Sequence, residues 1–212
     1  MSDYSPVEER FNVVSHFIGF LLSTIALLLL LVKTISYGTP LAILSVLIYG
    51  VSLIVLYAAS TLYHNAKAPK LRKRLKIFDH AAIFLLIAGT YAPYTLITLN
   101  GHGGWIIFGV VWSIALVGVI LKLFFTGKYK IVSTIMYVLM AWVIVFAVKP
   151  LMDNLSSEGL FWLAAGGLFY MIGALLYSIQ KIKFNHAIFH VFVLLGSFSH
   201  FYSIYFYVLQ GK

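Results

Sequence analysis

The pentapeptide HAIFH near the end of the chain places two imidazoles, those of His186 and His190, at the start of the last long apolar run. Residues four apart lie on one side of a helix, so both rings can meet the same ion. The same spacing separates Ser60 from His64 in the stretch STLYH, where another apolar run ends. Ionisable side chains are costly to bury in apolar segments, and they therefore indicate function.

Histidines from two helices predict a zinc site. Three imidazoles, from His64, His186 and His190, together with an open fourth position form the ligand set of a catalytic zinc ion. Calcium and magnesium prefer oxygen ligands instead. Asp79, near the start of the next apolar run, offers a carboxylate that could hold or deprotonate a zinc-bound water, whose pKa zinc lowers to about 7.

Each of these residues also has a simpler interpretation. A histidine pair on a membrane helix is usually interfacial polarity, and His64 alone could extend its ring to the interface. Asp79 stands beside the basic run KAPKLRKRLK and could pair with a lysine or an arginine. Three other histidines are not expected to bind the ion. His80 points about 100° away from Asp79 around the helix, and His200 lies about 21 Å along its helix from the first residue of the pair. His102 stands in a Gly-rich turn and is expected to be solvated.

Composition assigns these residues to an integral membrane protein. Apolar residues make up 62% of the 212 residues and charged residues 10%, whereas a soluble domain is about half apolar and a quarter charged. We therefore predict an all-α fold in which residues 1–212 form a single seven-helix transmembrane domain. Seven apolar runs approach the ~20 residues that cross a bilayer: roughly Val13–Val32, Leu41–Leu62, Ile77–Leu99, Gly104–Phe125, Ile131–Val148, Leu160–Ile179 and Ala187–Leu209.

Charge and missing motifs narrow the function further. The net charge of +9 is most simply matched to an anionic membrane face, so we expect membrane lipid and no nucleic acid as partner. The absence of cysteine removes disulfides and thiolate ligands. The chain also lacks the HExxH, GxSxG and Walker A motifs, and its last apolar run has no lysine for a retinal Schiff base.

The N-terminus lacks the basic start of a signal peptide, since acidic residues occupy that region. The stretch Ser5-Pro6-Val7-Glu8 has the pattern of a capping box with proline at the first helical position. We expect a short interfacial helix at about residues 6–12 that feeds into the first span, with a frayed tail as the alternative.

Basic residues predict the orientation. With the N-terminus inside, twelve of the fifteen lysines and arginines fall in inside segments, six of them between Lys67 and Lys76. The positive-inside rule then puts the N-terminus in the cytoplasm and the C-terminus outside the cell membrane. This topology gathers polar positions in the cytoplasmic layer: His64, Asp79, His186, His190, and one helix face with Glu9, Asn12 and His16, to which the sequence assigns no role.

The order of the motifs resembles the progestin and adipoQ receptor family, which belongs to a wider superfamily with the alkaline ceramidases. The matching motifs are Ser60-x-x-x-His64, Phe78-Asp79 and His186-x-x-x-His190. The segment from Glu9 to Gly19 is similar more narrowly to the hemolysin III branch of that family. The resemblance implies a zinc ion near the cytoplasmic side, held by the three histidines. It also implies that the aspartate contacts the zinc-bound water and that the serine lies beside the site.

Two functions fit this pattern. A zinc-dependent hydrolase would cleave an amide bond of a membrane lipid, as in ceramides, or an ester bond. In it Asp79 would be the general base, and Ser60 would position an oxyanion or the water. A hemolysin III-type membrane-active or sensing protein would instead hold a structural zinc and catalyse nothing. A transporter is the least favoured reading, because the chain lacks broken-helix repeats and a midplane charge pair.

Overall fold

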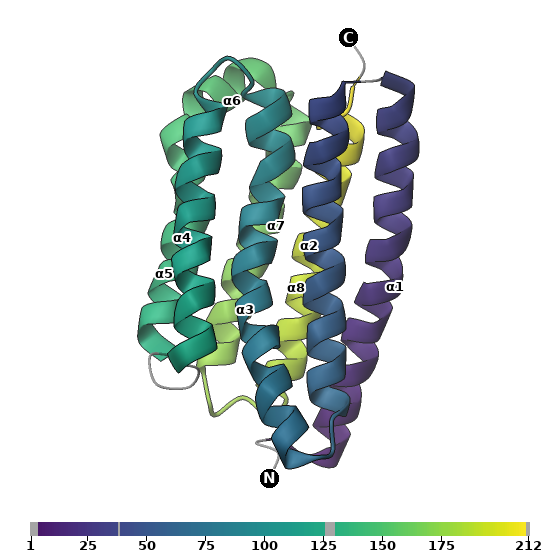
Figure 1. Ribbon diagram of the computed structural model, residues 1–212, viewed down its shortest axis with the longest axis vertical. Helices are drawn as coiled ribbons and strands as arrows, with labels where there is room; N and C mark the ends of the chain where they lie inside the picture. Colours follow the sequence, from purple (N-terminus) through teal and green to yellow (C-terminus); the bar gives the residue numbers. More distant parts are fainter. Residues whose placement is uncertain (1–3, 38, 126–129, 211–212) are drawn as a thin grey trace.

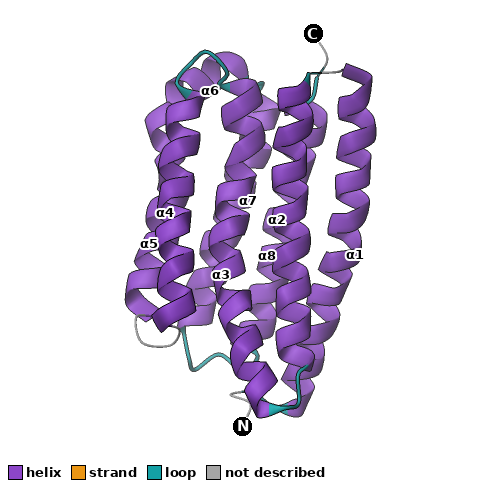
Figure 2. Cartoon of the chain, viewed as in Figure 1, coloured by secondary structure: helices purple, strands orange, loops and turns teal. Residues whose placement is uncertain are grey.

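The computed structural model describes residues 4–37, 39–125 and 130–210, and these residues are helical almost throughout, with no β-strand among them (Figure 2). Short π-helical segments, Tyr94–Thr98 and Ile204–Val208, extend the third and last helices, and a 3₁₀ segment, Val143–Ala147, joins α5 to α6. The α-helices are α1 (Pro6–Tyr37), α2 (Pro40–Asn65), α3 (Pro69–Pro93), α4 (Gly104–Phe125), α5 (Lys130–Trp142), α6 (Val148–Asn154), α7 (Ser157–Ser178) and α8 (Asn185–Ser203).

Seven of the described helical segments are long and apolar enough to cross a membrane, which confirms the predicted all-α, seven-span fold. They run side by side in one bundle, and the first and last described residues lie at opposite ends of it (Figure 1). With seven spans among the described residues, the first and last of these residues are expected on opposite sides of the membrane. Which end faces the cytoplasm stays a prediction.

The first helix is continuous. Residues 6–12 form the opening turns of α1 and not a separate helix, because no break occurs between Pro6 and Tyr37. The Ser5 hydroxyl accepts a hydrogen bond from the Glu8 backbone N–H at 3.2 Å, which is the serine half of the expected capping box.

The third helix begins earlier than its apolar run predicts. We expected the basic segment before Ile77 to be a connection, but α3 starts at Pro69 and only residues 66–68 link it to α2. Proline suits the first helical turn, where its missing N–H has no intrahelical partner to lose. Five of the six basic residues therefore lie in the first turns of α3, and Lys67 alone lies in the connection.

The fifth span continues past its predicted end. We expected the fifth apolar run to end at Val148, but the chain passes through the 3₁₀ segment into α6 and ends this span at Asn154. Pro150 lies in the first turn of α6, where a proline leaves no helical hydrogen bond unmade.

Large aromatic side chains fill the interior of the bundle. Tyr49 and Tyr57 of α2, Phe84 of α3 and Tyr94 are each at most 1% exposed. Glycines allow neighbouring helices to approach these rings, because a Cβ on Gly19 of α1 would lie 2.5 Å from the Tyr57 ring. Most of the large apolar side chains of α1 and α4 point outward instead, where lipid would cover them.

Four helix termini meet at one end of the bundle. The starts of α1, α3 and α8 and the end of α2 lie together there (Figure 1). The predicted metal ligands His64, His186 and His190 belong to these termini.

Candidate metal centre

Three histidines from α2 and α8 meet in the interior at this end of the bundle. His64 stands in the last turn of α2, and His186 and His190 occupy the first two turns of α8. They are 4%, 8% and 1% exposed. The Nε2 atom of His186 lies 3.0 Å from Nε2 of His64 and 3.0 Å from Nε2 of His190. These three side chains are therefore positioned to hold one metal ion.

The spacing of the nitrogens fits a tetrahedral ion. Nitrogens bound to zinc at about 2.0–2.1 Å in tetrahedral geometry lie about 3.3 Å apart. The two separations of 3.0 Å between these nitrogens need only small ring movements to reach that value. No fourth histidine or carboxylate among the described residues joins this group, so one coordination position is left for another ligand.

The start of α8 is held by α1 and α7. Phe184, just before the helix, has a left-handed backbone with φ 58° and supplies no side-chain cap. Instead, the Glu8 carboxylate of α1 lies near the backbone N–H of His186, and the two groups interact favourably. The Asn185 side chain donates to the Tyr177 carbonyl at 2.9 Å, which ties α8 to the end of α7. These contacts fix where His186 stands in the centre.

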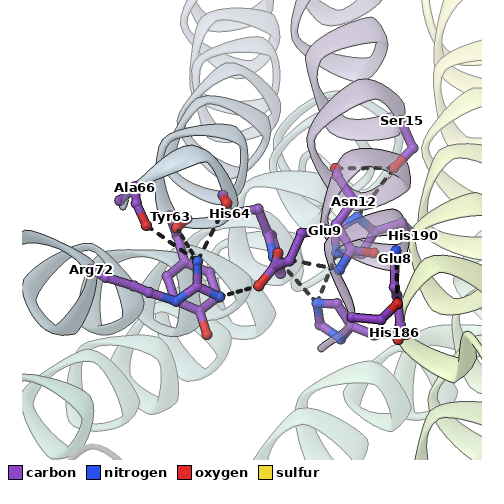
Figure 3. A network of polar contacts seen from close by, with 11 residues as sticks. Glu8, Glu9, Asn12, Ser15, Tyr63, His64, Ala66, Arg72, His186 and His190 are labelled. Carbon is purple, nitrogen blue, oxygen red and sulfur yellow. Dashed lines mark hydrogen bonds and ion pairs between the residues drawn. The ribbon is translucent and has the colours of Figure 1, made fainter. Parts of the chain in front are cut away.

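A carboxylate and a guanidinium lie on the outer side of His64. Oε2 of Glu9 lies 2.7 Å from Nδ1 of His64, and Oε1 of the same carboxylate pairs with Arg72 (Figure 3). Arg72 also donates to the backbone carbonyls of Tyr63 and His64, each at 3.3 Å, and of Ala66 at 3.4 Å. These contacts join three helix termini on the side of His64 that faces away from the other two histidines. The termini are the end of α2 and the starts of α1 and α3.

A second group of α1 side chains lies on the outer side of His190. Nδ1 of His190 lies 3.2 Å from the Ser15 hydroxyl, which in turn donates to the Asn12 carbonyl at 3.2 Å. The ring of His16 stacks on that of His190 with the centroids 3.4 Å apart and 10° between the planes. His16 is 3% exposed, and neither of its ring nitrogens has a hydrogen-bond partner among the described residues.

Tyrosine rings enclose the outer side of the histidine group. Tyr4 stacks on His186 with centroids 4.6 Å apart, and Tyr63 contacts His64 at the same centroid distance. Tyr177 contacts His186 from α7 at 5.2 Å. These rings help to bury the histidines.

Asp79 of α3 and Ser60 of α2 are both buried and lie near each other. They are 8% and 1% exposed. The Ser60 hydroxyl lies close to the Asp79 carboxylate, although it makes no regular hydrogen bond to any described residue. Lys76, one helical turn before Asp79, also acts on this carboxylate electrostatically. Asp79 is not part of the close histidine group, so its role and that of Ser60 stay predictions.

The remaining histidines expected not to bind the ion do not join the group. His80 accepts a hydrogen bond from the Tyr137 hydroxyl through its backbone carbonyl at 3.0 Å. His102 is exposed in the turn before α4. His200 is 6% exposed, and its Nε2 lies 3.2 Å from the Leu163 carbonyl.

Several residues around the centre have no predicted role in the sequence. Glu8, Ser15, Arg72 and Tyr4 contact the histidines or their helix starts only because distant segments meet here. The polar face of Glu9, Asn12 and His16 was the available signal, since polar side chains on one face of a membrane helix need partners. Arg72 gave no such signal, because it belongs to a basic run that the positive-inside rule already explains.

Comparison with known proteins gives the chain a family. A model of the family described as "Haemolysin-III related" matches residues 4–201. Hemolysin-3 of Bacillus cereus is 45% identical over 95% of this chain and 92% of its own length, and a Hemolysin-3 homolog of Bacillus subtilis (strain 168) is 43% identical over 96% and 95%. The human monocyte to macrophage differentiation factor is 32% identical over 77% of this chain and 70% of its own. The chain therefore belongs to the haemolysin-III related family of membrane proteins.

Proposed function

We propose that this protein is a zinc-dependent hydrolase that cleaves an amide or ester bond of a membrane lipid. The observation that carries the proposal is the convergence of three buried imidazole Nε2 atoms, with an open coordination position, at one end of a membrane-spanning bundle. A structural zinc site ordinarily has four protein ligands, whereas three ligands and an open position are typical of catalytic sites.

Zinc is the metal that best fits these donors. Imidazole nitrogens suit zinc better than calcium or magnesium, which take oxygen ligands. Bound by three histidines, zinc supplies Lewis-acid chemistry: it polarises a carbonyl and lowers the pKa of water to about 7.

Asp79 and Ser60 are the residues that we assign to proton transfer and positioning. As general base, the Asp79 carboxylate would take a proton from the attacking water and later pass it to the departing amine or alcohol. The products are then a fatty acid and an amine or alcohol, with one water consumed. Ser60 lies close enough to Asp79 to orient its carboxylate or the water through its hydroxyl.

The location of the centre favours a lipid as substrate. The histidines stand in turns close to the ends of helices that are long enough to span a membrane. The ends of a spanning helix meet the headgroup region, where a lipid carries its amide or ester linkage. The basic residues of α3 and of the segment before α8 belong to the same end, and by the positive-inside rule this end faces the cytoplasm.

The test is hydrolysis by the purified full chain reconstituted in lipid. A panel of ceramides, phospholipids and acylglycerols is incubated with zinc-loaded protein, and released fatty acid is measured by mass spectrometry. We expect turnover of at least one lipid, its loss after chelation and in His190→Ala, and its recovery when zinc is added back to the chelated wild type. A panel without zinc-dependent release of fatty acid would refute the hydrolase.

A second candidate is a membrane-active or sensing protein in which the metal is structural. The names of the two Bacillus relatives favour it, because one is called Hemolysin-3 and the other a Hemolysin-3 homolog. This candidate predicts that chelation lowers the thermal unfolding midpoint, and that a folded metal-free variant still lyses red cells. Lysis that disappears together with lipid turnover in Asp79→Asn would favour the hydrolase instead.

A further inference from the structure

The Glu9 carboxylate contacts both a candidate metal ligand and an arginine. One carboxylate oxygen lies 2.7 Å from Nδ1 of His64, and the other pairs with the guanidinium of Arg72 (Figure 3). The His64 side chain is 0% exposed and that of Glu9 is 14% exposed, so water screens this contact only weakly. Sequence reasoning gave Glu9 no role.

A carboxylate at this distance determines which nitrogen of His64 carries the proton. An ionised carboxylate only accepts hydrogen bonds, so the Nδ1 atom that faces Glu9 must be the protonated one. Nε2 is then free of a proton and faces the corresponding atom of His186 at 3.0 Å. Metal-binding histidines commonly donate their second ring N–H to a carboxylate in this way, which fixes the ring and makes it a stronger ligand.

We propose that Glu9 is a positioning residue of the metal centre, holding His64 in the tautomer and orientation that present Nε2 to the ion, and that Arg72 holds Glu9 in place. The inference rests on the metal centre of the proposed function and does not depend on hydrolysis.

The neighbouring amide does not replace Glu9. Nδ2 of Asn12 lies 3.5 Å from the same Nδ1 atom, at the outer limit of a hydrogen bond. An amide N–H cannot donate to an Nδ1 atom that already carries a proton for Glu9. The 2.7 Å contact is therefore the one that sets the tautomer.

Arg72 is placed to hold the carboxylate still. Its guanidinium donates to three backbone carbonyls at the end of α2 and lies 4.6 Å from the centroid of the Tyr63 ring. Arginine near a helix C-terminus satisfies carbonyls that lack intrahelical partners. The same side chain that closes α2 after His64 thus positions the carboxylate behind it.

The three histidines differ in this outer support. His64 has a carboxylate, His190 has the neutral Ser15 hydroxyl at 3.2 Å, and Nδ1 of His186 has no hydrogen-bond partner among the described residues. Hydrogen bonds to charged groups are about twice as strong as neutral ones. We therefore expect loss of Glu9 to weaken metal binding more than loss of the Ser15 hydroxyl.

The test measures zinc affinity of the full chain in detergent by competition with a chromogenic chelator. Glu9→Gln keeps the size of the side chain and removes its charge, and it should weaken zinc binding about 10–100-fold. The same substitution at Glu158, exposed at the start of α7 at the opposite end of the bundle, should leave affinity unchanged. In cobalt-loaded protein, Glu9→Gln should also shift the visible absorption bands, because the geometry at His64 changes.

A purely structural ion pair between α1 and α3 predicts a different result. Glu9→Gln and Arg72→Gln would then lower the thermal unfolding midpoint alike, with wild-type zinc affinity and cobalt spectrum, and this outcome overturns the proposal. If Glu9→Gln does not fold, Glu9→Asp keeps the charge and withdraws it by one methylene. It should lower zinc affinity and shift the cobalt bands, and unchanged values for both contradict the proposal.

These measurements separate the inference from the proposed reaction. A chain that binds zinc through His64 and Glu9 but hydrolyses no lipid leaves the positioning role intact. A wild-type chain that binds no zinc or cobalt overturns it together with the metal centre.

Discussion

Each of the three histidines supplies one nitrogen to the group that could hold a metal ion, and no fourth histidine or carboxylate among the described residues belongs to that group. We therefore expect His64→Ala, His186→Ala and His190→Ala each to reduce bound zinc at least about tenfold at limiting free metal, since loss of one of three protein ligands removes much of the binding free energy. Elemental analysis of the purified proteins gives zinc per chain. His102→Ala changes an exposed histidine in a turn and serves as the control. Full zinc content in any of the three variants would remove that residue from the centre.

Asp79 allows catalysis to be separated from metal binding. Because Asp79 lies outside the close histidine group, Asp79→Asn should keep wild-type zinc content. If Asp79 is the general base, lipid turnover should fall by about 10²–10⁴-fold, the usual contribution of a positioned acid or base. Zinc content and released fatty acid are measured on the same preparation. Unchanged turnover with full zinc content would exclude Asp79 as the base.

The site residues that could be predicted from the sequence differ from those that could not in whether a local pattern marks them. His64, His186 and His190 could be predicted because ionisable residues stand out in apolar runs, and i, i+4 spacing is readable along one helix. Arg72 and Ser15 act through contacts between segments about 60 to 175 residues apart. A basic run or a single serine carries no local pattern that predicts such a partner.

At the scale of helices, the apolar centres of the spans were predictable but several ends were not. An apolar run predicts which side chains face the hydrocarbon of the bilayer. It does not predict the ends of the helix, because a helix can continue beyond the hydrocarbon. The basic turns of α3 continue past Ile77 to Pro69 because proline starts the helix well, and α1 extends back to Pro6. These polar extensions bring Glu9 and Arg72 together, so the unpredicted helix ends are also those that build the centre.

Packing between α7 and α8 yields a prediction with an internal control. A Cβ on Gly166 would lie 2.3 Å from the His200 ring, which is held by the Leu163 carbonyl, whereas a Cβ on the adjacent Gly167 meets nothing within 4 Å. Gly166→Ala should destabilise the protein by about 1–3 kcal/mol, as overpacking of an interior usually does. Gly167→Ala should be neutral or slightly stabilising, because alanine favours the helix. Thermal unfolding midpoints in detergent compare the two, and equal midpoints would show that α7 and α8 are not packed this closely.

At the scale of the whole molecule, seven spans could be predicted because hydropathy alone sets their number. The lateral arrangement could not, since it depends on which faces pack together. The structure adds that α8 lies against both α1 and α7, so the first and last spans meet and α1 can reach the histidines. The N-terminal helix α1 thereby covers one side of the metal centre. Neither the apolar pattern of α1 nor its capping box indicates this role.

The orientation of the bundle is the last property that the sequence predicts, and the absence of cysteine makes it measurable. Lys181, in the segment between α7 and α8, lies at the end with the metal centre, and His102, in the turn before α4, lies at the other end. Both side chains are exposed, so a cysteine at either position should react with a maleimide reagent.

If the positive-inside rule holds here, a membrane-impermeant maleimide applied to intact cells should label His102→Cys. It should label Lys181→Cys only after the cells are permeabilised. The wild-type chain has no cysteine and should give no signal in either condition, which sets the background. The opposite pattern would place the histidines at the outer face of the membrane. A hydrolase would then meet lipids of the outer leaflet, so this measurement also determines which leaflet can supply the substrate.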